Sequence, residues 1–312
     1  MTLASAIAVR PDDGTPFLLT FSDSRLTLRS STNGDPPWTN AVIKSVGLGV
    51  RSAVLMAGST TLPVVTAAEG ARGLIANANV NRAPHTMSLL EEARQFLTFH
   101  QLAFRSVPDS SSHCADVIIA GFFADGVPGL VHVRNANGSA HLDVYRPRKG
   151  DFAVVTIGEA YFAGIATQAI GETLSGSTTG GVLINKVASV FWDIISHEGA
   201  PGIGGGLCVG RCCPDNSCWQ WPTVTIDGAS FYRGLPIEKV PDEWLPSAVT
   251  VDHDASLFAQ VERRCPPEGF ARTYPPADDT CEVEWKPTAI EAEILGRPLS
   301  DVAPGGERSA RC

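Results

Sequence analysis

Residues 2–25, TLASAIAVRPDDGTPFLLTFSDSR, decide how the rest of the chain is interpreted. Two apolar runs, 1–10 and 15–22, are separated by a segment with one proline and an Asp-Asp-Gly sequence, which is typical of a tight turn. Apolar runs of this length around a turn predict two antiparallel strands. The chain therefore opens with a predicted β-hairpin that ends in a polar Asp-Ser-Arg sequence at 23–25.

The elements expected after this hairpin come in segregated groups. Strands come first, then two helices, more strands, two further helices, and strand material again. This grouping, rather than a strict alternation of strand and helix, is typical of an α+β fold with antiparallel sheets. The expected strands are 53–58, 116–122, 130–133, 141–145, 152–158 and 224–226, and the expected helices are 60–78, one that begins near 88, 159–170 and 182–195.

Composition and charge exclude several classes of function. The chain has 312 residues, 44% of them hydrophobic and 18% charged, which is ample for a packed core in one large domain or two small ones. The 24 Lys and Arg against 33 Asp and Glu give a net charge of -9, and no basic run offers the positive face that nucleic acids require. No apolar stretch spans a bilayer and no signal-peptide pattern precedes the first strand. We therefore expect a cytoplasmic protein that binds neither nucleic acid nor membrane.

The last quarter of the sequence differs from the rest. Ten of the 22 prolines follow residue 228, and no hydrophobic period holds for long beyond it. Only 256–264 and 288–295 have a helical pattern there. The sequence therefore predicts two parts, a folded domain at 1–228 and an irregular, Pro-rich C-terminal extension at 229–312.

Thr2 is a candidate nucleophile on chemical grounds. If Met1 is removed, which the small second residue permits, the chain begins with a threonine on the first predicted strand. A threonine hydroxyl is a weak nucleophile, but a free α-amine with an ordinary pKa of about 7.7–8.0 accepts its proton near neutral pH. A nearby lysine would favour the deprotonated hydroxyl, and a carboxylate would hold that lysine in place. The sequence does not decide whether Met1 is removed.

Several short motifs follow one another along residues 2–228. They are Thr2 on the first strand, Asp23-Ser24-Arg25 after the second, Lys44 within Val42–Val46, Ala57-Gly58 after a later strand, and the segments Ile119–Phe122 and Gly129–Val133. In this order they resemble the proteasome β-subunit family of N-terminal nucleophile (Ntn) hydrolases. The sequence Gly158-Glu159-Ala160-Tyr161 is more similar to the bacterial ancestral β-subunit (Anbu) relatives, since typical proteasome subunits have Gly-Ser-Gly there.

This resemblance implies a fold, an activity and a set of site residues. The fold would be a four-layer αββα sandwich, with two antiparallel sheets between helix layers. Thr2 would be the nucleophile through its hydroxyl and the base through its amine, Asp23 would hold Lys44, and Lys44 would tune the nucleophile. The backbone amide of Gly58 would stabilise the oxyanion. The implied activity is threonine-type amide or peptide hydrolysis through an acyl-enzyme, without metal or organic cofactor, in a subunit that self-associates as a ring or a helical stack.

The sequence also departs from the family pattern. Asp23 and Lys44 are 21 positions apart, more than is usual, which implies an insertion around 33–37. The family's later aspartate and serine have no match around the glycine-rich segment 202–206. Two other functions therefore stay open. One is a proteasome-fold scaffold or assembly protein without turnover, which a retained Met1 would favour, and the other is an Ntn amidase that acts on a small amide.

Four of the eight cysteines, Cys208, Cys212, Cys213 and Cys218, lie within eleven residues. They lack the Cys-x2-Cys spacing of a zinc site and no histidine is close, so reduced or opportunistically oxidised thiols are favoured over a metal.

Two further features have structural explanations. The glycines of 202–206 do not open a helix after a strand, so close approach to a neighbouring strand is expected there rather than dinucleotide binding. Glu159 is expected to stabilise a helix N-terminus.

Overall fold

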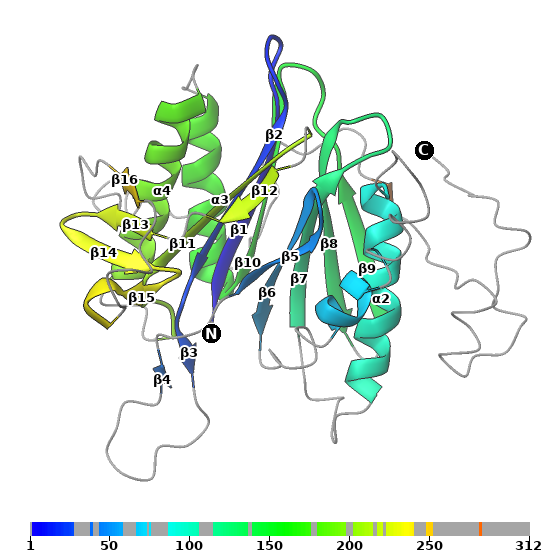
Figure 1. The fold of residues 1–312 in the computed structure, drawn as a ribbon, viewed down its shortest axis with the longest axis horizontal. Coiled ribbons are helices and arrows are strands. Elements are labelled where there is room, and N and C mark those ends of the chain that lie inside the picture. Colours follow the sequence, from blue (N-terminus) through cyan, green and yellow to red (C-terminus); the bar gives the residue numbers. More distant parts are fainter. Residues whose placement is uncertain are drawn as a thin grey trace, which may run out of the picture.

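The structure is a computed structural model of the chain. It describes residues 2–27, 38–39, 44–58, 67–73, 75, 87–105, 115–136, 139–175, 180–197, 202–214, 217–220, 223–239, 248–251 and 281–282. Within these ranges the protein is a mixed α+β fold with two large antiparallel sheets, as the sequence predicts (Figure 1). Met1, the expected insertion at 33–37 and the predicted helices 256–264 and 288–295 lie outside the described residues.

The N-terminal hairpin is the centre of a five-stranded sheet with the order β10-β1-β2-β11-β12. The predicted pairing of β1 with β2 is confirmed, and Ala4 lies opposite Ser22. Because the two strands run in opposite directions, the start of β1 and the end of β2 lie side by side at one edge of the sheet. The strands are β1 (Leu3–Arg10), β2 (Phe17–Asp23), β10 (Asp151–Gly158), β11 (Leu207–Cys213) and β12 (Ser217–Gln220).

The second large sheet has six strands in the order β17-β9-β8-β7-β6-β5. The antiparallel meander predicted over 116–145 forms its β7, β8 and β9, and the β5–β6 hairpin pairs with β7. The strands are β5 (Ser45–Gly49), β6 (Ser52–Gly58), β7 (Ala115–Phe122), β8 (Pro128–Ala136), β9 (Ser139–Tyr145) and β17 (Cys281–Glu282).

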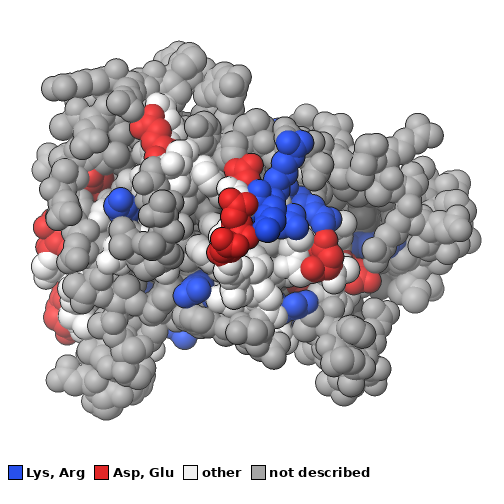
Figure 2. All heavy atoms as spheres, turned by 90° about the horizontal axis from the view of Figure 1, so that it is seen from above, with Lys and Arg blue, Asp and Glu red and all other residues white. Residues whose placement is uncertain are grey.

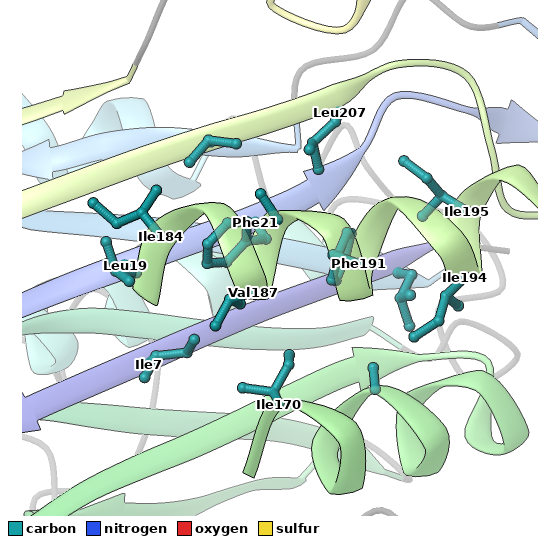
Figure 3. Close-up of a cluster of buried hydrophobic side chains, with 14 of the residues drawn as sticks. Ile7, Leu19, Phe21, Ile170, Ile184, Val187, Phe191, Ile194, Ile195 and Leu207 are labelled. Carbon is teal, nitrogen blue, oxygen red and sulfur yellow. The ribbon is translucent and has the colours of Figure 1, made fainter. Parts of the chain in front are cut away.

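Helices α3 (Ala160–Ser175) and α4 (Gly180–Ser196) pack on one face of the five-stranded sheet. Apolar side chains of α4 recur every three to four residues, including Ile184, Val187 and Phe191, and therefore form one face of the helix. Figure 3 shows this face against Leu19 and Phe21 of β2. The rings of Phe21 and Phe191 lie 6.0 Å apart, so the hairpin and α4 share one core.

Helix α2 (Leu89–Arg105) and the helical residues 67–73 contribute buried side chains to a second core on the six-stranded sheet. The glutamate half of a capping box is present at the start of α2. The Glu91 side chain reaches back and its Oε2 accepts from the Ser88 amide and from the Ser88 hydroxyl, each at 2.9 Å. Of the helix predicted at 60–78, residues 60–66, 74 and 76–78 lie outside the described part of the chain.

A third core contains side chains from both large sheets. Ala4, Ala6 and Ala8 of β1 belong to it, together with residues of β6, β7 and β10. Leu3 and Ile7 belong instead to the core shared with α3 and α4. Side chains alternate between the two faces of a strand, so β1 contributes to a different core on each face.

A smaller four-stranded sheet, with the order β15-β14-β13-β16, lies beside α4. The rings of Trp192 of α4 and Phe231 of β14 are 5.3 Å apart. The domain boundary expected at residue 228 falls in the turn between β13 and β14. The elements are β13 (Thr223–Ile226), β14 (Ala229–Tyr232), β15 (Leu235–Pro236), the short 3-10 helix η2 (Ile237–Lys239) and β16 (Ala248–Val251), and a separate two-stranded ladder joins β3 (Leu26–Thr27) to β4 (Trp38–Thr39).

Figure 2 shows the end of the molecule that carries the β1–β2 turn. Lys and Arg side chains lie beside Asp and Glu on this face, and Arg146 forms an ion pair with Asp125 of the β7–β8 turn. Charges of both signs are therefore mixed there. None of the described helices is long and apolar enough to cross a membrane.

Candidate active site

Two of the four predicted site residues, Asp23 and Lys44, form a buried ion pair beside the peptide unit that follows Thr2. Thr2 directly precedes β1, Asp23 ends β2, and Lys44 directly precedes β5. The side chains of Asp23 and Lys44 are 0% and 2% exposed, and Thr2 is 5% exposed. The hairpin places the start of β1 beside the end of β2, and the packing of the two sheets brings β5 to the same place.

Asp23 accepts four hydrogen bonds from described residues. Oδ1 accepts from the Lys44 ammonium at 2.6 Å and from the Leu3 amide at 2.9 Å. Oδ2 accepts from the amides of Gly204 at 3.1 Å and of Arg25 at 3.3 Å. Burial raises the pKa of the Asp23 carboxyl, while Lys44 and the amides of Leu3 and Gly204 act in the opposite direction.

Lys44 is fixed at both ends. Its backbone carbonyl accepts from the Met56 amide of β6 at 3.0 Å, and its ammonium forms the buried ion pair with Asp23. Burial lowers the pKa of Lys44 below the ordinary lysine value, and the charge of Asp23 limits this decrease. The ammonium shares Asp23 Oδ1 with the Leu3 amide, so it lies beside the peptide unit that joins Thr2 to Leu3.

That peptide unit is held from both sides. Its N–H donates to Asp23, and its carbonyl, Thr2 O, accepts from the Glu159 amide at 3.2 Å. Gly158 lies against the same carbonyl with φ 132°, and a Cβ there would lie 1.8 Å from Thr2 O. Position 158 therefore excludes every side chain, which explains the glycine of the Gly-Glu pair.

Glu159 has the structural role expected from the sequence. Its side-chain Oε2 accepts from the Phe162 amide at 3.1 Å, in the first turn of α3. The side chain thereby satisfies one of the amides that a helix leaves unpaired at its start. Its backbone amide serves the site, because it is the donor to Thr2 O.

Gly58, the fourth predicted residue, lies at the exposed end of β6. It lies two residues after Met56, whose amide donates to the Lys44 carbonyl. Its φ is 119°, a value that favours glycine. No contact given by the structure ties Gly58 directly to Asp23 or Lys44 within the described residues. Its role as oxyanion donor stays a prediction.

The loop at 202–206 is part of the site, although only a packing role is expected for it from the sequence. The Gly204 amide donates to Asp23, and the Gly204 carbonyl accepts from the amides of Ser24 at 3.2 Å and Arg25 at 3.0 Å. A Cβ at Gly204 would lie 2.6 Å from the Arg25 guanidinium carbon. The expected close approach to a neighbouring strand is confirmed, and the glycine run is the signal for it.

The thiol of Cys208 lies close to the ion pair but is a poor nucleophile. Burial raises its pKa to about 12, so the thiol stays protonated near neutral pH. Cys208 and Cys213 are free, whereas Cys212 is disulfide-bonded and lies opposite Cys218 in the strand register. The cluster therefore contains both kinds of cysteine that the sequence analysis left open, reduced at Cys208 and Cys213 and oxidised at Cys212. Among the described residues, no group of three or more His, Cys, Asp or Glu is arranged to hold a metal ion.

No family model matches the chain, and no curated protein matches it.

Proposed function

We propose that this protein is a threonine-type amide hydrolase in which Thr2, once its α-amine is freed by cleavage of the Met1–Thr2 bond, is the nucleophile. The observation that carries this proposal is the buried Asp23–Lys44 ion pair at 2.6 Å. A buried ion pair is costly to desolvate, and this one lies beside the Thr2–Leu3 peptide unit. A functional charge at this position explains why the pair is buried at the start of β1.

The proposal includes the fold family. We take the chain to be a proteasome-like Ntn hydrolase, closest to the bacterial ancestral β-subunit type, with a four-layer αββα sandwich. The three buried cores support this arrangement, since one is shared with α3 and α4, one contains both sheets, and one includes α2. Self-association as a ring or helical stack, and a peptide as substrate, belong to the same proposal.

The chemistry begins with proton transfer within Thr2. The free α-amine takes the hydroxyl proton as Oγ1 attacks the carbonyl carbon of the substrate amide. The positive charge of Lys44 favours the oxyanionic form of the nucleophile, and the Gly58 amide is the proposed donor to the tetrahedral oxyanion. The C–N bond then breaks, the leaving nitrogen takes the proton from the α-ammonium, and the acyl group stays as an ester on Thr2.

Water completes the cycle. It attacks the ester carbonyl while the α-amine accepts its proton, and the Thr2 oxygen leaves and regains a proton from the α-ammonium. Asp23 does not touch the substrate in this scheme. It holds the Lys44 ammonium and the Leu3 amide on one oxygen, so it fixes the distance between the charge and the nucleophile.

Hydrolysis of fluorogenic peptides and of small amides tests the proposal, with the N-terminus of the same sample determined by intact mass. We expect cleavage by protein that lacks Met1, retention of activity in Thr2→Ser, and loss of at least about 1,000-fold in Thr2→Ala. Turnover of small amides alone would indicate an amidase. A protein that keeps Met1 and cleaves neither substrate would contradict the proposal and favour the scaffold.

A further inference from the structure

The turn between β14 and β15 reaches the residue that follows Asp23. The turn consists of Arg233 and Gly234, with φ 48° and 83°. The buried Ser24 hydroxyl donates to the Gly234 carbonyl at 2.8 Å and accepts from the Gly206 amide at 2.8 Å. Ser24 therefore connects two segments that are far from it in the sequence.

These contacts continue to the ion pair through backbone. Gly206 and Gly204 belong to one short loop, and the Gly204 amide donates to Asp23 Oδ2. The Gly204 carbonyl in turn accepts from the Ser24 amide. The β14–β15 turn, Ser24 and the glycine loop thus enclose the Oδ2 side of Asp23, opposite the oxygen that binds Lys44.

The contact leaves no room for additional atoms. A Cβ at Gly234 would lie 2.5 Å from the Ser24 Cβ and 3.0 Å from the Cys208 sulfur. A Cβ at Gly206 would lie 2.4 Å from the Gly234 carbonyl oxygen. Both approaches are closer than side chains tolerate, so the turn and the loop fit together only as glycines.

The turn is also anchored away from the site. Phe231 of β14 belongs to the core beneath α3 and α4 and contacts the Trp192 ring. β14 pairs with β13 through four residue pairs, and β15 pairs with β14. A turn held by this sheet can resist displacement of Ser24, as an isolated loop could not.

We propose that Ser24 and the β14–β15 turn are positioning elements for Asp23. The β14–β15 hairpin, which follows residue 228, is therefore part of the functional domain. This inference rests on the proposed hydrolase function and deepens it. Loss of the Ser24 contacts loosens the Oδ2 side of Asp23, weakens its hold on Lys44, and lowers the Lys44 pKa further. The nucleophile then loses its neighbouring positive charge at a lower pH.

The test compares Ser24→Ala and Gly234→Ala with two matched controls. Gly228→Ala introduces the same substitution at a turn glycine with φ 72° that has nothing within 4 Å of the added atom. Ser5→Ala removes a buried hydroxyl that forms a hydrogen bond with the Thr156 hydroxyl at 2.6 Å and is not one of the four described donors to Asp23. If Gly234→Ala does not fold, Ser24→Ala carries the test alone.

Two readouts are needed. The first is steady-state kinetics on the cleaved amide, where we expect kcat to fall about tenfold in the two test variants with KM within about twofold, and the controls to keep the wild-type values. The second is the Lys44 pKa, measured by NMR with 13C-labelled lysine and assigned with Lys44→Arg. It should decrease in the test variants only.

The outcomes separate the two proposals. A wild-type protein without amidase activity, but with a Lys44 pKa that depends on Ser24, would overturn the hydrolase function and leave the positioning contact in place. An active wild type in which Ser24→Ala changes neither kcat nor the Lys44 pKa would overturn the positioning role. A decrease of kcat and Lys44 pKa in Gly228→Ala equal to that in Gly234→Ala would overturn it as well.

Discussion

Replacement of Asp23 by asparagine removes the carboxylate charge that pairs with the buried Lys44. Oδ1 of the carboxylate accepts hydrogen bonds from the Lys44 ammonium and the Leu3 amide. Oδ2 accepts from the amides of Gly204 and Arg25. Asparagine has a single acceptor oxygen, so its amide group must face donors on one side or the other. Removal of one partner from a buried ion pair costs about 3–5 kcal/mol, a large part of the total stability of a typical domain.

The loss of stability in Asp23→Asn should depend on pH in a defined direction. Without Asp23 the folded-state pKa of Lys44 decreases further, because the charge that opposes the effect of burial is gone. Between that pKa and the ordinary lysine value of about 10.4, the unfolded chain binds more protons than the folded one, so stability rises with pH. Wild type shows the same effect over a narrower pH range, because its Lys44 pKa is lowered less, so the free-energy difference between Asp23→Asn and wild type should be larger at pH 7 than at pH 9.

Urea unfolding at these two pH values is the assay, with Asp125→Asn as the control. Asp125 pairs with Arg146 on the surface, where its side chain is 51% exposed, so its replacement should cost about 1 kcal/mol or less. The double variant Asp23→Asn/Lys44→Met removes the unpaired charge and should recover about 2 kcal/mol or more. If Asp23→Asn is as mild as Asp125→Asn, or if the double variant recovers nothing, the buried pair does not have the role assigned to it.

Three further predictions concern the site and its surroundings. The pH profile of amide cleavage should have an alkaline limb below the ordinary lysine pKa because burial lowers the pKa of Lys44, and Lys44→Arg should remove that limb along with most activity; an unchanged limb in the variant would contradict the assignment. Gly158→Ala should destabilise the fold by about 3 kcal/mol or more in thermal or urea unfolding, because its Cβ collides with Thr2 O, whereas Gly126→Ala, also at positive φ but in open space, should cost about 1 kcal/mol; equal losses would refute the clash. Burial raises the pKa of Glu92 to about 7, so the contribution of Glu92 to stability should fall as pH rises from about 5 through 7, whereas buried His100, with a pKa lowered to about 4, acts in the opposite direction; the stability of Glu92→Gln relative to wild type should therefore increase over this pH range in urea unfolding, and parallel curves would refute it.

Local patterns were sufficient to predict much of the fold. The turn residues at 10–14 and the apolar runs around them gave the β1–β2 hairpin, and the spacing of apolar residues gave α4 within two residues at its start and one at its end. β11 was not predicted, because its cysteines suggested thiol or metal chemistry instead of a strand. Its buried face becomes evident only when the strand is paired with β2.

The site was predictable only in part, for a physical reason. Asp23 and Lys44 were selected as chemical groups in a familiar order, and their contact needed the two sheets to meet. The donors from Gly204 and Leu3 are backbone amides, which every residue except proline carries, so no residue type identifies them. The Ser24–Gly234 contact joins positions 210 apart, and nothing in either local sequence indicates it.

The identity of the nucleophile is tested most directly by mass spectrometry after reaction with an electrophile selective for N-terminal threonine. We expect a single adduct on protein that lacks Met1, located at Thr2 by peptide mapping, and no adduct on Thr2→Ala. Adducts of equal amount on wild type and Thr2→Ala, or no adduct on wild type from which Met1 has been removed, would contradict the assignment of Thr2.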